Sequence, residues 1–112
     1  MKVYIAGPMT GLPDFNYPAF FAAEEMLKEL GLEPFNPAHH NGETLEEALA
    51  NVKTATHSWE WYLKQDLSIM LGCDAIYPLE GWENSKGAKL EMHVAQEVDI
   101  PVLQIIDLDE DQ

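Results

Sequence analysis

The chain has few basic residues, a single cysteine and no long apolar run. Its 6 lysine and arginine residues stand against 20 aspartates and glutamates, which gives a formal net charge of -14 at pH 7. A charge of this sign repels nucleic-acid backbones and anionic membrane surfaces, so we expect neither nucleic acid nor membrane as a partner. It also opposes the binding of a phosphate-bearing substrate, which would need local donors such as the N–H groups at the start of a helix.

Cysteine pairs and long apolar segments, which mark secreted and membrane-spanning proteins, are missing. Cys73 is the only cysteine, which excludes an internal disulfide and fits a reducing compartment. No segment approaches the roughly 20 apolar residues that cross a bilayer. The first residues, MKVYIAGP, lack the basic and apolar regions of a signal peptide. We therefore expect a cytoplasmic protein.

The length of 112 residues is enough for one hydrophobic core and too short for two. Hydrophobic residues make up 46% of the chain and charged residues 23%, which is ordinary for a folded globular protein. We expect one domain over residues 1–112, in which residues 107–112 form an acidic, solvated tail.

Segments with the pattern of strands alternate along the chain with segments that have the pattern of helices. Short apolar runs predict strands, and apolar residues spaced three and four apart predict helices. The predicted strands cover residues 2–6, 32–35, 73–79 and 101–106, and the predicted helices cover residues 17–30, 45–52, 58–71 and 85–98. Gly31 is placed to end the first helix, and Thr44 with Glu47 forms a capping box before the second.

This alternation implies parallel strands joined by right-handed crossovers. The expected fold is α/β: a single-domain, doubly wound (Rossmann-like or flavodoxin-like) parallel sheet of four to five strands with helices on both faces. Ligands bind such a sheet at the carboxyl ends of its strands. The glycine- and proline-rich segment GPMTGLPDFNYP follows the first strand and should be a loop across this edge.

Two carboxylates interrupt the apolar faces of predicted helices. Burying an unpaired carboxylate is costly, so a carboxylate with apolar or small neighbours three and four residues away is informative. Asp66 and Glu91 meet this condition at all four positions, and Glu24 meets it at three. The neighbours are Tyr62, Leu63, Ile69 and Met70 for Asp66, Gly87, Ala88, Val94 and Ala95 for Glu91, and Phe20, Phe21 and Leu27 for Glu24. The pattern suggests a site without being unique to one.

Glu91 lies within the first two turns of the helix after the third strand, and so at the ligand-binding edge of the sheet. The small residues around it would leave space beside the carboxylate. Two carboxylates that face one partly dry cleft can have different pKa values, so that one acts as nucleophile and the other as proton donor, as in glycosyl transfer. The alternative is structural: Asp66 is hydrogen-bonded to a tryptophan N–H or to the backbone, and Glu91 reaches solvent at a helix edge.

Three segments carry a resemblance to a known family: VYIAGP at the first strand, QDLSIMLGCDAIY across the third helix and strand, and SKGAKLE at the start of the last helix. They resemble the signature segments of the nucleoside 2-deoxyribosyltransferase superfamily. More closely, they resemble its DUF4406 branch and the deoxynucleoside 5′-monophosphate N-glycosidases. The resemblance extends over nearly the whole chain. It implies an enzyme that cleaves the N-glycosidic bond of a 2′-deoxynucleoside or of its 5′-monophosphate, without a cofactor.

The resemblance also implies roles for individual residues. Glu91 matches the glutamate that attacks the anomeric carbon and forms a covalent deoxyribosyl-enzyme intermediate. Asp66 matches the aspartate that protonates the departing base. Tyr4 matches a tyrosine that orients the nucleophile, although it could equally be a core aromatic residue with a satisfied hydroxyl. Gly7 would let the loop backbone approach the ligand.

Position 85 separates two branches of the superfamily. Transferases that act on free nucleosides resemble one another in having an acidic residue there, whereas the monophosphate hydrolases have serine. This chain has Ser85, whose hydroxyl could accept a phosphate together with the N–H groups of Lys86 and Gly87. A plain helix N-cap is the alternative role of Ser85. The resemblance further implies a homo-oligomer, a dimer or larger, in which a neighbouring subunit completes the site.

Other residues are less informative. The adjacent His39 and His40 should point apart in a loop, and no third ligand lies at a suitable spacing, so we expect no metal site. Tryptophans such as Trp59, Trp61 and Trp82 are more often core or interface residues than platforms for a base, although Trp82 could cover a bound base from its loop. Two further functions stay open: a non-catalytic module that binds a nucleotide or a nucleotide-derived signal in the same cleft, and a purely structural subunit. Whether water or a second base would complete the reaction is also undecided.

Overall fold

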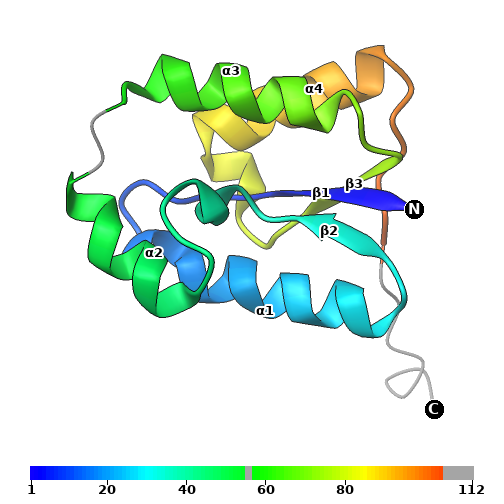
Figure 1. Ribbon diagram of the computed structural model, residues 1–112. Helices are drawn as coiled ribbons and strands as arrows, with labels where there is room; N and C mark the ends of the chain where they lie inside the picture. Colours follow the sequence, from blue (N-terminus) through cyan, green and yellow to red (C-terminus); the bar gives the residue numbers. More distant parts are fainter. Residues whose placement is uncertain (55–56, 105–112) are drawn as a thin grey trace.

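The computed structural model describes residues 1–54 and 57–104. Strands and helices alternate in it as the sequence predicts (Figure 1). The elements are β1 (Lys2–Ala6), α1 (Tyr17–Glu29), β2 (Glu33–Phe35), α2 (Leu45–Asn51), α3 (Trp59–Met70), β3 (Ala75–Pro78) and α4 (Lys86–Glu97), with short 3-10 turns η1 (Pro13–Asn16), η2 (Pro37–His40), η3 (Val52–Thr54) and η4 (Trp82–Asn84). The predicted acidic tail, residues 107–112, lies outside the described residues.

The sheet is parallel and has β1 at its centre, in the order β2-β1-β3. It has three strands among the described residues, so the prediction of four to five strands was wrong. The predicted fourth strand covers residues 101–106, of which 105 and 106 lie outside the described residues. The described part forms a single bridge, between Val102 and Ile76, with one backbone hydrogen bond on each side of it. Two prolines limit this pairing, because Pro101 has no N–H to donate and β3 ends at Pro78.

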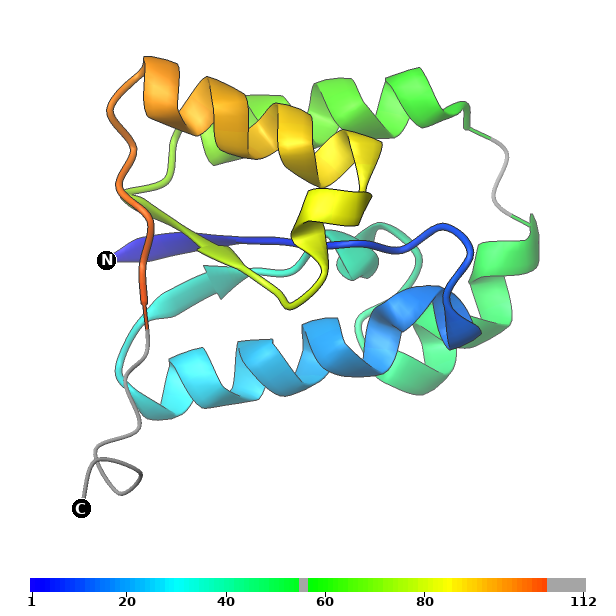
Figure 2. The ribbon, with the colours of Figure 1, turned by 180° about the vertical axis from the view of Figure 1, so that it is seen from behind.

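Helices cover both faces of the sheet, as predicted. Figures 1 and 2 show α1 and α2 on one face and α3 and α4 on the other. The alternation of side chains along β1 serves both layers: Val3 and Ile5 are buried in the cluster under α1, and Tyr4 and Ala6 are buried in the cluster under α3 and α4. Tyr4 therefore lies on the same face as the two helices that carry Asp66 and Glu91.

Local capping chemistry sets the ends of the helices. Gly31 has a φ of +82° after the last turn of α1, a conformation that glycine adopts without strain, and this confirms its predicted role. The Thr44 hydroxyl accepts the Glu47 N–H at 3.2 Å at the start of α2, as predicted. The Glu47 carboxylate, however, accepts the N–H of Glu43 and not that of Thr44. Among the described residues, no helix has the length and apolar character needed to cross a membrane.

Candidate active site

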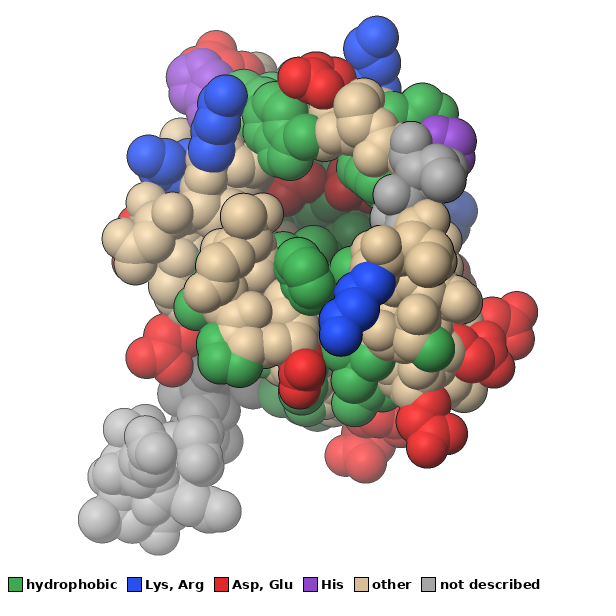
Figure 3. All heavy atoms as spheres, turned by 90° about the vertical axis from the view of Figure 1, so that its left-hand side faces the viewer, with side chains coloured by type: hydrophobic (Ala, Val, Ile, Leu, Met, Phe, Trp, Pro, Cys, Tyr) green, Lys and Arg blue, Asp and Glu red, His purple; other side chains and the backbone are tan. Residues whose placement is uncertain are grey.

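A cleft of about 700 Å³ opens at the carboxyl end of the sheet, between α3, the start of α4 and the loop after β1. Figure 3 shows it as a hollow with acidic side chains inside. Its volume suits a small-molecule ligand. The structure brings all six predicted site residues together in the lining of this cleft: Tyr4, Gly7, Asp66, Ser85, Gly87 and Glu91.

Glu91 is held at the inner wall of the cleft by Tyr4. Its side chain is only 6% exposed, and the buried Tyr4 hydroxyl donates a hydrogen bond of 2.5 Å to Glu91 Oε2. Burial raises the pKa of Glu91 to about 8; the hydrogen bond from Tyr4 lowers it in part, and the charge of Asp66 raises it further. The alternative of a solvent-facing Glu91 is therefore excluded by its burial.

Asp66 reaches the same cleft from α3 and is paired with a histidine. Burial raises the pKa of its carboxyl group, while a hydrogen bond from His40 opposes the rise. His40 Nε2 lies 2.6 Å from Asp66 Oδ1. The Tyr4 hydroxyl also lowers the pKa of Asp66, so it acts on both carboxyl groups. Within the part of the chain that the structure describes, Asp66 is hydrogen-bonded to His40 and not to a tryptophan N–H or a backbone group.

His40 is the site residue that the sequence analysis missed. The sequence presents it only as half of a histidine pair without a third metal ligand. Its position after β2, at the carboxyl edge of a parallel strand, was the signal that could have identified it. Within residues 1–54 and 57–104, no three histidine, cysteine, aspartate or glutamate side chains come close enough together to hold a metal ion.

The neighbouring His39 has a different partner, outside the cleft. Its Nε2 lies 2.8 and 2.9 Å from the two carboxylate oxygens of Glu24, and its Nδ1 lies 2.9 Å from the Gly42 carbonyl oxygen. Burial raises the pKa of Glu24, but the hydrogen bonds from His39 and Asn36 outweigh this effect and lower it. Glu24 is thus a buried carboxylate with an anchoring role, which explains why apolar neighbours alone did not distinguish it from Asp66 and Glu91.

The two glycines of the cleft are required for different reasons. A Cβ at Gly7 would lie 2.8 Å from the Cβ of Leu79, so this glycine permits close packing between the loop after β1 and the end of β3. A Cβ at Gly87 would meet nothing closer than the Trp59 indole nitrogen, at 3.9 Å. Gly87 therefore leaves open space in the cleft, whereas the tight contact at Gly7 is made with protein.

The start of α4 provides donors at the rim of the cleft. The Ser85 hydroxyl caps the helix by accepting the Ala88 N–H at 3.2 Å. The N–H groups of Lys86 and Gly87 belong to the first turn, where helical geometry supplies no carbonyl partner. Lys86 also brings a positive charge, with its Nζ 4.6 Å from the centre of the Trp59 ring. Ser85 is thus an N-cap, and the first turn of α4 is suited to an anion.

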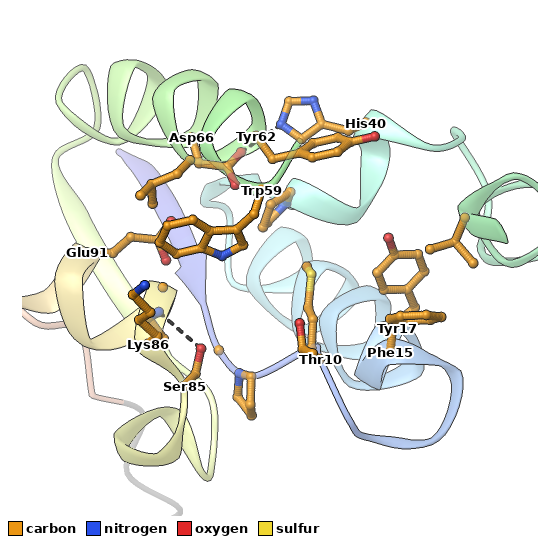
Figure 4. Close-up of a pocket in the computed structure, with 18 of the residues that line it drawn as sticks. Thr10, Phe15, Tyr17, His40, Trp59, Tyr62, Asp66, Ser85, Lys86 and Glu91 are labelled. Atoms are coloured by element: carbon orange, nitrogen blue, oxygen red, sulfur yellow. Dashed lines mark hydrogen bonds and ion pairs between the residues drawn. The ribbon is translucent and has the colours of Figure 1, made fainter. Parts of the chain in front are cut away.

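Aromatic side chains form the outer walls of the cleft (Figure 4). Trp59 and Phe15 remain 43% and 38% exposed, and Tyr17 accepts a hydrogen bond of 2.8 Å from Asn41 Nδ2 at the far end from Glu91. Trp82 packs against the buried cluster that contains Tyr4 and does not line the cleft, so it is a core residue and not the cover of a bound base. Trp59 takes the wall position instead.

The sequence matches, over residues 1–104, the family described as "Domain of unknown function (DUF4406)". The chain belongs to the DUF4406 family. The match spans β1 to β3 and α4, and so includes every predicted site residue of this DUF4406 protein. Among curated proteins, none shows significant sequence similarity to it.

A solved structure shares the fold of this DUF4406 protein. It is a 2-deoxyribosyltransferase from the psychrotolerant bacterium Bacillus psychrosaccharolyticus. The TM-score is 0.64 and the sequence identity is 21%, and the alignment covers 96% of this chain and 78% of that chain. The family match confirms the DUF4406 branch that the sequence indicated, and the shared fold agrees with the predicted α/β architecture.

Proposed function

We propose that this DUF4406 protein cleaves the N-glycosidic bond of a 2′-deoxynucleoside or its 5′-monophosphate through a covalent deoxyribosyl-Glu91 intermediate. The observation that carries the proposal is the convergence of Glu91 and Asp66, from separate helices, on one cleft with the Tyr4 hydroxyl acting on both. Two carboxyl groups at a sugar-sized cavity are the groups that retaining glycosyl transfer uses. The fold shared with a 2-deoxyribosyltransferase agrees with this chemistry.

The chemistry needs one proton shared between the two carboxyl groups. The Glu91 carboxylate attacks C1′ of the sugar while the C1′–N bond breaks and its electron pair passes to the base nitrogen. Asp66 gives its proton to the base, which leaves in neutral form. Water or a second base then attacks C1′, its proton returns to Asp66, and the Glu91 carboxylate is released. Water gives a hydrolase, and a second base gives a deoxyribosyltransferase.

The competent form has Glu91 ionised and Asp66 protonated. With the Glu91 pKa at about 8, roughly a tenth of the empty protein would have Glu91 ionised at pH 7. Because the two groups interact, the proton belongs to the pair, and a substrate that places developing positive charge at C1′ beside Glu91 favours the competent form.

The first turn of α4 is the proposed place for a 5′-phosphate. The N–H groups of Lys86 and Gly87, together with the Lys86 ammonium group, provide local positive charge in a strongly acidic protein. Gly87 leaves room there, and Trp59 stands beside it as an apolar wall. The base would extend from Asp66 toward the aromatic walls of the cleft.

Base release tests the proposal. Purified protein is incubated with each deoxynucleoside 5′-monophosphate and each free deoxynucleoside, and the free base is measured by chromatography. Glu91→Gln should reduce the rate of release to that of the blank. Glu24→Gln is the matched control, because Glu24 is also 6% exposed but lies outside the cleft, so it should still release base. An added acceptor base then separates transferase from hydrolase.

Binding without base release would contradict the proposal. In that case a calorimetric titration that detects nucleotide binding would support the non-catalytic binding module. A specific observation keeps that alternative in view: the raised pKa of Glu91 leaves the empty cleft largely without an ionised nucleophile at neutral pH.

We also propose that a neighbouring subunit completes the cleft. Phe15 and Trp59 leave apolar surface exposed at its mouth, which a second chain or a ligand would cover. Light scattering coupled to size-exclusion chromatography should show a dimer or larger assembly, and a monomer at assay concentration would refute this part of the proposal.

A further inference from the structure

His40 is fixed against Asp66 more firmly than a loop residue would be. The pair is largely shielded from solvent, with side-chain exposures of 18% for His40 and 15% for Asp66. Three aromatic rings meet the imidazole in edge contacts, with centroid distances of 6.2 Å for Phe35, 6.1 Å for Trp61 and 5.6 Å for Tyr62. A hydrogen bond in such a shielded setting is stronger than one in water.

The backbone that carries His40 is itself anchored. The Asn36 side chain accepts the Ala38 N–H at 2.9 Å at the start of the turn η2, and His39 ties the same turn to Glu24 on α1. These contacts restrict the backbone of the turn η2, so the His40 imidazole has little freedom to move away from α3. His40 is thus positioned by both layers of helices.

We propose that His40 is a positioning residue that makes Asp66 an effective proton donor, an inference that rests on the proposed function. The Nε2–H of His40 donates to Asp66 Oδ1, which leaves Oδ2 to carry the acidic proton on the side of the cleft. When the base takes this proton, the charge that remains on Asp66 is stabilised by the same N–H through a charge-assisted hydrogen bond. When the water or acceptor base gives a proton back, Oδ2 receives it and the pair is restored.

The chemistry of the leaving base separates this role from a structural one. A neutral base needs a proton to leave, whereas a base that already carries a positive charge, such as an N7-methylated purine, leaves without one. If His40 acts through Asp66, its loss should slow release of the neutral base and spare release of the cationic base. A loss of structure would slow both.

The experiment compares two substrates of the wild-type protein, a deoxynucleotide with a neutral purine and its N7-methylated form, each corrected for its uncatalysed rate. His40→Phe keeps an aromatic ring among Phe35, Trp61 and Tyr62 but has no N–H. It should lower kcat/KM for the neutral base about 10- to 100-fold, the effect of losing a hydrogen bond to a charged group, and change the cationic substrate less than about threefold. Asp66→Asn should show the same selective loss.

Two further variants control for folding. His40→Gln retains an N–H near the position of Nε2 and should recover much of the activity on the neutral base. His93→Phe replaces an exposed imidazole on α4 that lies outside the cleft, so it should leave the ratio of the two substrates unchanged. Equal loss on both substrates in His40→Phe, in a sample whose melting curve shows a folded protein, would overturn the role of His40.

The pH profile gives a second readout. The titratable groups that interact with Asp66 are Tyr4 from β1, Tyr17 from α1, His40 from the turn η2 and Glu91 from α4. The hydrogen bond from His40 lowers the pKa of Asp66, so the acid limb of kcat/KM should move to higher pH in His40→Phe. An unmoved acid limb would contradict the inference. Absence of base release from every substrate by the wild-type protein would instead refute the proposed function.

Discussion

Replacing Glu91 by glutamine should make the protein more stable at neutral pH, although it removes the proposed nucleophile. The pKa of Glu91 rises from its ordinary value of 4.5 to about 8 on folding, chiefly because of burial. Below pH 4.5 the group is protonated in both the folded and the unfolded chain and costs nothing. Between pH 4.5 and 8 the unfolded chain loses the proton while the folded chain keeps it, so the free energy of unfolding falls as pH rises.

The size of the effect follows from the shift in pKa. At about 1.4 kcal/mol for each pH unit, the cost reaches about 3 kcal/mol at pH 7 and about 5 kcal/mol above pH 8. Glutamine has the same shape and still accepts the Tyr4 hydroxyl, but it has no charge to desolvate. Glu91→Gln should therefore raise the free energy of unfolding at pH 7 by up to about 3 kcal/mol. For a chain of this length, that is a rise in Tm of roughly 10 to 20 °C.

The assay is chemical or thermal unfolding of both proteins from pH 4 to pH 9. The difference in stability should be near zero at pH 4 and grow up to about pH 8. Glu24→Gln provides a control of opposite sign, because Glu24 is equally buried but has a lowered pKa, so its loss should destabilise the fold at neutral pH. If Glu91→Gln destabilised the protein as Glu24→Gln does, or if the difference did not change with pH, the reasoning on Glu91 would be refuted.

Three further predictions concern activity. The pH profile of kcat/KM should be bell-shaped. Below the acid limb, Glu91 and Asp66 both hold protons and no nucleophile is left, whereas above about pH 8 the pair has lost its last proton and no acid is left. A value of kcat/KM that keeps rising above pH 9 would contradict this prediction. Tyr4→Phe keeps the ring stacked on Phe35 but removes the hydroxyl that lowers the pKa of Glu91. The value of kcat/KM should therefore fall about 10- to 100-fold, and the alkaline limb of its pH profile should move to higher pH. An unchanged profile would exclude this role of the hydroxyl. Ser85→Asp keeps a residue that can cap α4 but adds negative charge at the proposed phosphate site. The value of kcat/KM for the 5′-monophosphate, divided by that for the free nucleoside, should fall at least about tenfold. An unchanged ratio would place the phosphate elsewhere.

The sequence predicted the layers of the fold because each layer depends on local patterns. The apolar spacing of the helices, the glycine after α1 and the threonine before α2 all act within a few residues of where they stand. The extent of the sheet depends on partners far along the chain. The segment after Pro101 has a strand-like composition, but its pairing is limited by the short β3 beside it, which composition does not reveal.

The candidate site divides in the same way. Asp66 and Glu91 were identified because a carboxylate on an apolar helix face is a local signal, and the topology of a parallel sheet places both near one edge. His40 was missed because it is 26 residues from Asp66 and meets it only after the turn η2 folds back toward α3. Trp59 and Trp82 could not be distinguished either, since their places depend on how α3 and the turn η4 pack.

The most direct test of the central claim is the mass of the protein itself during turnover. Wild-type protein quenched in acid while it acts on an accepted deoxynucleotide should gain the mass of the deoxyribosyl group of that substrate, and peptide mapping should place the adduct on Glu91. Glu91→Gln should gain no mass under the same conditions. An adduct on another residue, or steady base release with no adduct under rapid quenching, would contradict Glu91 as the nucleophile.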